Sequence, residues 1–291
     1  MVQDILVPFM IHEQPVRGRV VRLGSVVNSI LARHNYPVLV SHVLAETLVI
    51  AGILSSSLKH EGVFTIQVQS KGAITLLVVD AAFGGALRGY AQFDAQAIAA
   101  LSRDSMLPDM FGEGFLAITL DAGSGTQRYQ GVVPLEGKTI GEAVQRYFTQ
   151  SMQMEMQIKL AAGSISDVRT KEDRWVAGGI YVEKMPDTVT ADADVWQRAK
   201  TLMLTVRDDE LLDETLEIPD LLHRLFHEDG VWVYDAATLI DQCRCSREKI
   251  QKTLSGMGAK AIAQMMVDDR IEVTCQFCNR SEVFIESDVK Q

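Results

Sequence analysis

The chain has 291 residues and a formal net charge of −10, and 47% of its residues are apolar and 23% charged. This length predicts two or three structural units, and the composition is typical of a soluble globular protein. The opening residues (MVQD) lack the basic start of a secretory signal, and the most apolar stretch, 43–54, contains Glu46 and is too short to span a bilayer. We therefore expect a soluble, cytoplasmic protein with no membrane partner.

The negative charge is concentrated in one stretch. Residues 185–230 contain 12 acidic and 4 basic side chains, a net charge of −8, whereas 1–184 (16 basic, 17 acidic) and 231–291 (8 basic, 9 acidic) carry −1 each. A nucleic-acid-binding surface needs clustered Lys and Arg. The distribution therefore argues against nucleic acid as a partner, and it divides the chain into three predicted parts: 1–184, 185–230 and 231–291.

Residues 1–184 combine strand and helix patterns. Alternating or β-branched apolar residues predict strands at 63–68, 73–79, 115–120, 128–133 and 175–182, with turns at 69–72 and 121–127. Helices are predicted at 41–58, 94–101 and 139–150, the last with Thr139 at its N-cap and Glu142 three residues later. Strand pairs interspersed with helices predict an α+β fold with an N-terminal mixed α/β core domain.

The acidic stretch 185–230 is predicted to be a helical linker. The proline and aspartates of 186–194 precede a helix with apolar residues at helical spacing, and a second helical pattern at 211–227 contains Pro219, which should break or kink it. Two interpretations remain open at this point. The segment is either a solvated linker packed on its neighbour, or a marginally stable one that dissociates and exposes apolar side chains.

The last part, 231–291, is short. Its pattern predicts a strand at 231–236, helices at 246–254 and 260–268, and a hairpin of 271–274 and 283–285 that carries a Cys-x-x-Cys at its turn. A unit of this size buries so little apolar surface that a metal is expected to hold it folded.

All four cysteines lie in this last part, as the close pairs Cys243/Cys245 and Cys275/Cys278, with 29 residues between the pairs. Four thiolates in two pairs provide the tetrahedral ligand set of a zinc site. An iron–sulfur cluster uses the same ligands and is the alternative metal centre. Each sulfur also lies near a partner with which it can form a disulfide, so the cluster is either a structural staple or an oxidant-sensitive switch.

Other motifs give no catalytic site. His223 and His227 have helical spacing, but Arg224 stands where a zinc protease needs Glu, so surface or partly buried histidines are expected. The Cys-x-x-Cys lacks the strand-to-helix setting of a thioredoxin motif, and the glycine pairs lack a phosphate-loop Lys. Met152, Met154 and Met156 are expected in a strand or core. We therefore predict that the protein is not an enzyme.

Eight stretches of the chain, spread over nearly its whole length, closely resemble the bacterial redox-regulated heat-shock chaperone family, the 33-kDa chaperonins. They are 17–21 (RGRVV), 69–72 (QSKG), 88–91 (RGYA), 129–137 (YQGVVPLEG), 147–151 (YFTQS), 221–227 (LLHRLFH), 243–249 (CRCSREK) and 273–278 (VTCQFC). The sequence departs from the family at Asp241 and Gln242, where an aromatic or apolar residue is frequent.

The resemblance implies an ATP-independent holdase that is inactive when reduced and zinc-bound through Cys243, Cys245, Cys275 and Cys278. Oxidation would form the neighbouring disulfides Cys243–Cys245 and Cys275–Cys278, release zinc, unfold the tail and linker, and expose a surface for unfolded client proteins. The active form is expected to be a homodimer. Two other functions remain as alternatives: a binding module with a structural zinc ribbon, and a thiol-disulfide oxidoreductase.

Overall fold

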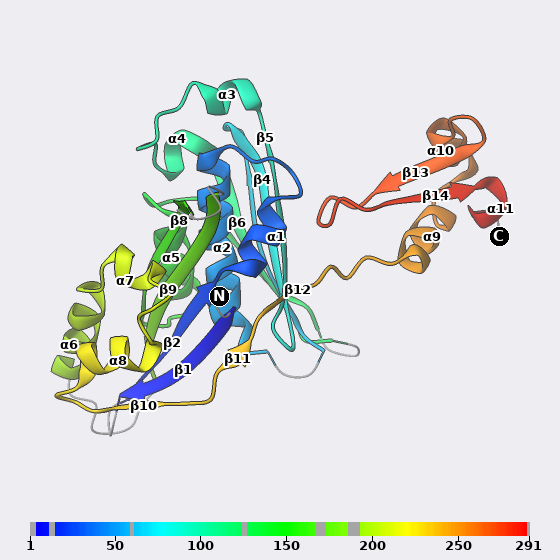
Figure 1. The fold of residues 1–291 in the computed structure, drawn as a ribbon. Coiled ribbons are helices and arrows are strands. Elements are labelled where there is room, and N and C mark those ends of the chain that lie inside the picture. Colours follow the sequence, from blue (N-terminus) through cyan, green and yellow to red (C-terminus); the bar gives the residue numbers. More distant parts are fainter. Residues whose placement is uncertain are drawn as a thin grey trace. The chain divides into compact units, whose positions relative to one another are not determined.

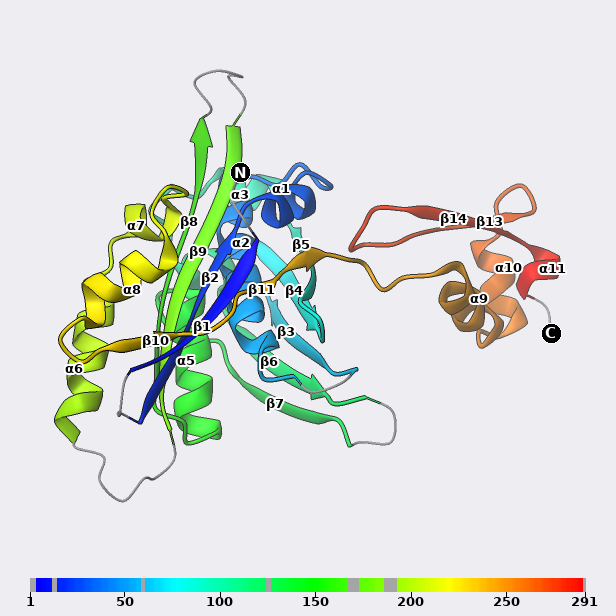
Figure 2. The same cartoon turned by 60° about the horizontal axis from the view of Figure 1, so that its bottom comes forward.

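The computed structural model describes residues 4–11, 15–58, 61–123, 127–166, 173–185 and 193–289. The chain forms two compact units, Met1–Asp241 and Gln242–Gln291. Figure 1 and Figure 2 label the elements of both units.

The first unit contains two mainly antiparallel β-sheets and the helices packed on them. Its elements are β1 (Ile5–Ile11), β2 (Val16–Leu23), α1 (Ser25–Leu31), α2 (Val38–Ser55), β3 (Val63–Ser70), β4 (Ile74–Ala82), β5 (Ala86–Phe93), α3 (Ala95–Ala99), α4 (Leu107–Phe111), β6 (Gly114–Asp121), β7 (Tyr129–Pro134), α5 (Ile140–Ser151), β8 (Met156–Ser166), β9 (Asp173–Lys184), α6 (Ala193–Leu204), α7 (Asp208–Leu212), α8 (Ile218–Phe226), β10 (Val231–Val233), β11 (Ala237–Thr238) and β12 (Ile240–Asp241).

The first sheet, sheet A, has the strand order β10-β1-β2-β9-β8, with β11 also paired to β1. The second, sheet B, has the order β12-β5-β4-β3-β6-β7. The pairs are antiparallel except for β12 and β5, which run parallel. This mixture of antiparallel sheets and helices confirms the predicted α+β fold class.

Helix α2 lies between the two sheets and forms the centre of the core (Figure 1, Figure 2). A Cβ added to Gly179 of β9 would lie 2.7 Å from Val49, and one added to Gly89 of β5 would lie 3.1 Å from Leu44. Glycine at these strand positions therefore lets both sheets approach the helix closely. The helix is long and apolar enough to cross a membrane, and 78% of it is buried inside the protein, as in a core helix.

Most elements predicted for the first part are present with shifted ends. The predicted strands correspond to β3, β4, β6, β7 and β9, and the predicted helices to α2, α3 and α5. The hydroxyl of Thr139 accepts from the Glu142 amide, as expected of an N-cap, while the Glu142 carboxylate accepts from the amide of Lys138. Residues 124–126 of the expected turn at 121–127 lie outside the described residues.

The acidic segment, defined here as residues 193–226, folds as α6, α7 and α8 on the outer face of sheet A. Pro219 lies in the first turn of α8, where its missing amide is tolerated, so the predicted helix of 211–227 is broken there. Residues 186–192, expected to open the first helix, lie outside the described residues. The apolar sides of these helices and of sheet A form one buried cluster: Val7, Phe9, Ile11, Val16, Val20, Ala161, Ile180, Val182, Trp196, Ala199, Met203, Val206, Leu211, Ile218, Leu221, Leu222, Leu225 and Phe226.

The strand expected at the start of the tail, β10, pairs with β1 of sheet A, with Val231 opposite Ile11 and Val233 opposite Phe9. The division into compact units therefore falls between Asp241 and Gln242, whereas the charge pattern places a boundary at residue 230. The physical reason is that a short apolar strand gains a complete hydrogen-bonded neighbour at the open edge of sheet A.

The second unit contains α9 (Arg247–Ser255), α10 (Ala259–Met265), β13 (Arg270–Thr274), β14 (Ser281–Ile285) and α11 (Glu286–Val289). Strands β13 and β14 form the predicted antiparallel hairpin. Its buried apolar core consists of Leu254, Ile262, Ile271, Phe284 and Val289.

Candidate metal centre

The first cysteine pair lies in an extended segment directly before α9. The Ser246 hydroxyl caps this helix by accepting from the Lys249 amide at 3.3 Å. The Lys249 ammonium donates to the Arg244 carbonyl at 2.9 Å, between the two cysteines. The helix cap and this hydrogen bond together fix the backbone of the Cys243–Cys245 segment.

The second pair lies at the turn of the β13–β14 hairpin, as the sequence predicted. The Cys275 amide donates to the Arg280 carbonyl at 2.9 Å, and the Asn279 amide donates to the Cys275 carbonyl at 2.8 Å. Asn279 has a φ of 56°, in the left-handed region that Asn tolerates better than most residues. The tight turn brings both thiols to the same end of the hairpin.

The four sulfur atoms converge on one point. All lie within 4.8 Å of one another, and the Cys243–Cys275 and Cys245–Cys278 sulfurs are 3.7 and 3.4 Å apart. A tetrahedral zinc with bonds of about 2.3 Å would separate its sulfurs by about 3.8 Å, whereas a disulfide bond is about 2.05 Å long. The arrangement is therefore that of a metal-ligand tetrad of free thiols, which can hold a metal ion.

The electrostatics of the tetrad favour a bound cation. Burial raises the pKa of the Cys245 thiol, and the three neighbouring sulfurs raise it further. Burial also raises the pKa of Cys278, against a hydrogen bond at Arg280 that lowers it. Four thiolates this close need a positive charge among them to ionise together at neutral pH, and thiolate is the form that binds metals.

The small core of the second unit is consistent with a structural role for such a centre. Its five buried apolar residues contribute much less burial than the cores of the first unit. Domains of this size usually require a metal or disulfides for stability. One cysteine pair lies at the start of the unit and the other at the turn of its hairpin, so a metal would link the α9 side to the hairpin.

Arg247 makes a second link between α9 and the hairpin, and sequence reasoning missed its role. The guanidinium lies 4.3 Å from the centre of the Phe284 ring and donates to the Val283 carbonyl at 2.8 Å. It also pairs with Glu282 at 3.2 Å and Asp288 at 3.0 Å. The sequence signal that could have pointed to this role is the position of Arg247 directly after Ser246, the N-cap of α9.

The remaining sequence candidates do not join a site. His223 on α8 and His227 at its C-cap are exposed, with ring centres 5.7 Å apart, which agrees with the expectation of surface or partly buried histidines. Met156 is buried at the start of β8, whereas Met152 is exposed and Met154 half-buried. Across the described ranges, the cysteine tetrad is the single group of His, Cys, Asp or Glu placed to hold a metal.

The fold and the tetrad together define an α+β protein with a small second unit whose four cysteines can hold a metal ion. The model of the family described as Hsp33 protein matches residues 4–284. The chain belongs to the Hsp33 family.

Curated relatives and a solved structure agree with this assignment. The 33 kDa chaperonin of Caulobacter vibrioides (strain NA1000 / CB15N) is 39% identical, over 95% of this chain and 93% of its own. That of Neisseria meningitidis serogroup B is 35% identical, over 98% and 90%. The crystal structure of the 33 kDa chaperonin of Thermotoga maritima shares the fold, with a TM-score of 0.79 and 23% identity over 98% of this chain and 96% of that one. The family and these names support a chaperone function, which implies client proteins as partners.

Proposed function

We propose that this chain is a redox-regulated, ATP-independent holdase that binds unfolding proteins during oxidative and heat stress. In the reduced protein, zinc held by Cys243, Cys245, Cys275 and Cys278 keeps the second unit folded, and the protein is inactive. The observation that carries the proposal is the convergence of four thiol sulfurs within 4.8 Å in a chain of a chaperone family. Zinc is the proposed metal because it prefers tetrahedral thiolate ligands and has no redox chemistry of its own.

Oxidation is the proposed activating step. Each cysteine pair gives two electrons to an oxidant such as hydrogen peroxide, whose O–O bond breaks and which takes up two protons to leave as two waters. One S–S bond forms per pair, and the zinc ion leaves because a disulfide is a poor ligand. The stabilisation lost is about 10–16 kcal/mol by the precedent of zinc fingers, which exceeds the stability of a small domain.

The pairing of the disulfides decides whether the unit unfolds. We propose Cys243–Cys245 and Cys275–Cys278, which close only short local loops and leave α9 and the hairpin unconnected. The cross-pairs Cys243–Cys275 and Cys245–Cys278 are the competing outcome, at sulfur separations of 3.7 and 3.4 Å. Cross-pairing would close loops of about thirty residues and keep the unit stapled. Peptide mapping of the oxidised protein by mass spectrometry distinguishes the two.

The part of the chain that responds to oxidation is proposed to be the acidic linker of 185–230, which precedes the cysteines in the sequence. When the second unit unfolds, this segment leaves sheet A and exposes apolar side chains of both surfaces to clients. The active form is proposed to be a homodimer in the cytoplasm that acts without enzymatic turnover and without nucleic-acid or membrane partners. The packing of this segment on sheet A through apolar side chains supports the proposal, because its departure would expose an apolar surface.

The test is to add peroxide at mildly raised temperature and follow zinc release, free thiols and light scattering of an unfolding client, all without ATP. We expect zinc to leave, four thiols to be lost and client aggregation to be suppressed. A variant with all four cysteines changed to serine serves as the oxidant-insensitive control. If zinc leaves while client aggregation proceeds unchanged, the holdase proposal fails.

The peroxide experiment and two further assays separate the two alternative functions. A structural zinc-ribbon module would keep its metal under oxidant and bind its partner in a salt-sensitive way. A thiol-disulfide oxidoreductase would turn over a dithiol substrate, which an insulin-reduction assay detects.

A further inference from the structure

The acidic segment is held on sheet A by one buried cation as well as by apolar packing. Arg22, on β2, is 6% exposed although it lies on an otherwise apolar strand face. Its Nη1 donates to the Leu216 carbonyl at 2.8 Å, its Nε to Leu211 at 3.4 Å and its Nη2 to Glu210 at 3.5 Å. All three carbonyls belong to the end of α7 and to the loop that leads into α8, so the guanidinium binds the backbone of the segment.

The neighbouring strand is shaped for the same contact. Gly178 of β9 lies directly opposite Arg22 in the register of the β2–β9 pair. A Cβ added to Gly178 would lie 2.5 Å from the Leu211 carbonyl oxygen and 3.1 Å from its carbon, and its three nearest atoms all belong to Leu211. The missing side chain therefore lets the end of α7 approach the sheet close enough to reach Arg22.

The position of Arg22 at the carboxyl end of α7 is electrostatically favourable. The last carbonyls of a helix have no partner within the helix and carry its negative dipole end, so a cation there is favourable. Burial lowers the pKa of the Arg22 guanidinium, while the charges of Asp213, Glu217 and Glu214 on the same loop raise it. The acidic loop thus compensates the buried cation, and the cation satisfies carbonyls that would otherwise be buried without donors.

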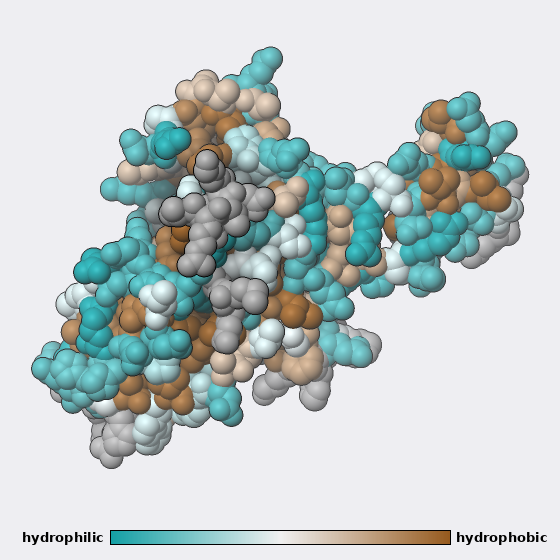
Figure 3. Space-filling model, in the orientation of Figure 1, coloured by the Kyte–Doolittle hydropathy of each residue, from teal (hydrophilic) through white to brown (hydrophobic). Residues whose placement is uncertain are grey.

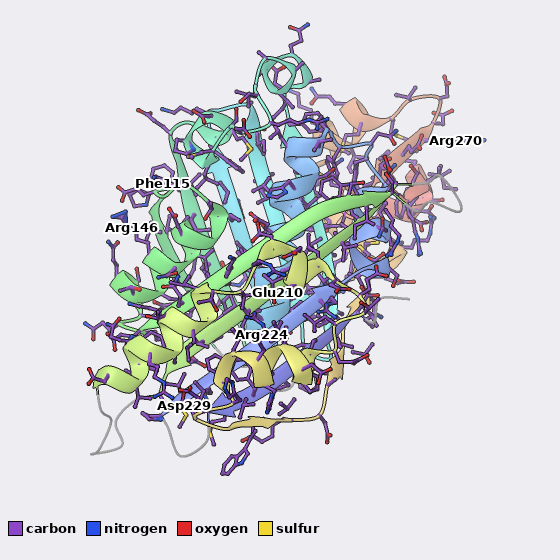
Figure 4. The ribbon with its side chains drawn as sticks, turned by 60° about the vertical axis from the view of Figure 1, so that its left-hand side comes forward. Phe115, Arg146, Glu210, Arg224, Asp229 and Arg270 are labelled. Atoms are coloured by element: carbon purple, nitrogen blue, oxygen red, sulfur yellow. The ribbon has the colours of Figure 1, made fainter. Side chains whose placement is uncertain are left out.

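The ion pairs of the segment are more exposed than Arg22, including that of Arg174 on β9 with Glu214, whose side chains are 38% and 20% exposed. Lys159 lies 3.6 Å from Asp208, whose side chain is 71% exposed, and Arg224 of α8 pairs with Glu210 of α7 at 3.0 Å within the segment itself (Figure 4). In the view of Figure 3, the region of these helices at the lower left has hydrophilic side chains interspersed with hydrophobic ones. Apolar packing is not directional, whereas hydrogen bonds to specific carbonyls fix one register.

We infer that Arg22 and Gly178 form a docking socket for the carboxyl end of α7, and that this socket sets how readily the acidic segment leaves sheet A. The inference rests on the proposed function, in which departure of this segment activates the chaperone, and it names the residues that resist departure. The socket recognises backbone carbonyls rather than side chains, so its specificity comes from the position of the helix end and from the surrounding carboxylates.

The deciding variant is Gly178→Ala, with Gly163→Ala as its matched control. Gly163 lies on β8 beneath the same segment, but a Cβ there would meet only the Leu212 Cδ1, at 3.5 Å, an ordinary contact. The measurement is the rate of proteolytic cleavage within residues 193–226 in the reduced, zinc-loaded full chain. The fluorescence of Trp196, which is 6% exposed on α6, gives a second reading.

We expect cleavage to be at least about tenfold faster in Gly178→Ala, because cleavage follows the population of the open segment, and the Trp196 emission to shift to longer wavelength. Gly163→Ala should stay within about twofold of the natural chain. Equal cleavage rates in the two alanine variants would overturn the inference. If Gly178→Ala does not fold, Arg22→Met gives the same reading, because it removes the donors without adding volume against Leu211.

Client aggregation assays on the same samples keep this inference separate from the proposed function. Fast cleavage with suppressed aggregation in the absence of oxidant supports both. Fast cleavage with unchanged aggregation leaves the socket in place and counts against the holdase mechanism. Slow cleavage in both Gly178→Ala and Arg22→Met counts against the socket, whatever the oxidant experiment gives.

Discussion

The carboxylate of Asp241, two residues before Cys243, is paired with the guanidinium of Arg33 in the turn that follows helix α1. The same carboxylate accepts from the Ser29 hydroxyl at 2.6 Å, and both charged side chains are mostly buried. Asp241 is also the last residue of the first unit. Asp241 therefore has a structural role, since it anchors the chain immediately before the first cysteine pair.

The anchor predicts local protection of β12. In Asp241→Asn, the loss of a charged hydrogen-bonding partner should cost about 1.5–3 kcal/mol, which corresponds to roughly tenfold to hundredfold faster exchange of protected amides. The amide to follow is that of Ile240, which donates to Gly85 at 2.9 Å. Arg128→Gln, which breaks the exposed pair with Asp121, is the control and should leave this exchange rate unchanged. Unchanged exchange in Asp241→Asn would show that the anchor does not hold β12.

Arg247 should affect how firmly the second unit holds its metal. Arg247→Ala removes the contact with the Phe284 ring and the hydrogen bonds to the hairpin, at an expected cost of about 1–2 kcal/mol because the side chain is partly exposed. We expect a chelator to withdraw zinc several times faster from this variant than from the natural chain. Arg270→Ala, an exposed position at the start of β13, is the control. Equal withdrawal rates would mean that the cysteines alone hold the unit.

Sheet A should lose stability in acid through Glu183. Burial raises the pKa of this carboxyl, but hydrogen bonds from Tyr181 and Arg17 and the charge of Arg19 outweigh it, so the folded pKa lies below the ordinary value of 4.5. A depressed pKa stabilises the folded state above the unfolded value, and this stabilisation is lost as the pH falls through the folded value.

The corresponding experiment compares urea unfolding midpoints of the natural chain and Glu183→Gln at falling pH. The variant should be less stable by about 1–3 kcal/mol at neutral pH, and the gap should narrow as the pH falls below 4.5. Glu155→Gln, at a partly exposed pair with Lys184, should behave like the natural chain. A constant gap across the pH range would contradict the assignment of the acid sensitivity to Glu183.

Replacement of one metal ligand should release the second unit without oxidant. Cys245→Ser removes one thiolate from the tetrad, so we expect zinc content to fall well below one per chain and residues 242–289 to lose amide protection. The core around helix α2 should keep its protection in the same exchange experiment, since it includes neither the cysteines nor residues of the acidic segment. Lys252→Ser, on exposed α9, is a control for the substitution itself. Full zinc content in Cys245→Ser would exclude Cys245 as a ligand.

Several elements were accessible from local sequence because their signals are local. The N-caps Thr139 and Ser246 lie one residue before the helices they begin, and the Cys-x-x-Cys lies at the hairpin turn that alternation predicted. Pro219 correctly predicted a break in the helical pattern of 211–227, because it lies in the first turn of α8. The first compact unit ends at Asp241, whereas the charge pattern places a boundary at residue 230. The difference arises because β10 pairs with β1, more than two hundred residues earlier in the chain. No local sequence pattern indicates a strand partner at that separation.

The sequence by itself determined that four thiols in two pairs would form one centre in a small C-terminal unit, because the ligand types and spacings are local properties of the chain. The tertiary structure alone decided what holds the acidic segment and the residue before the first cysteine. The bond from Arg22 to the Leu211 carbonyl joins residues 189 positions apart, and that from Ser29 to Asp241 joins residues 212 apart. Such contacts follow from the register of strands and the packing of helices, which only the folded chain brings together.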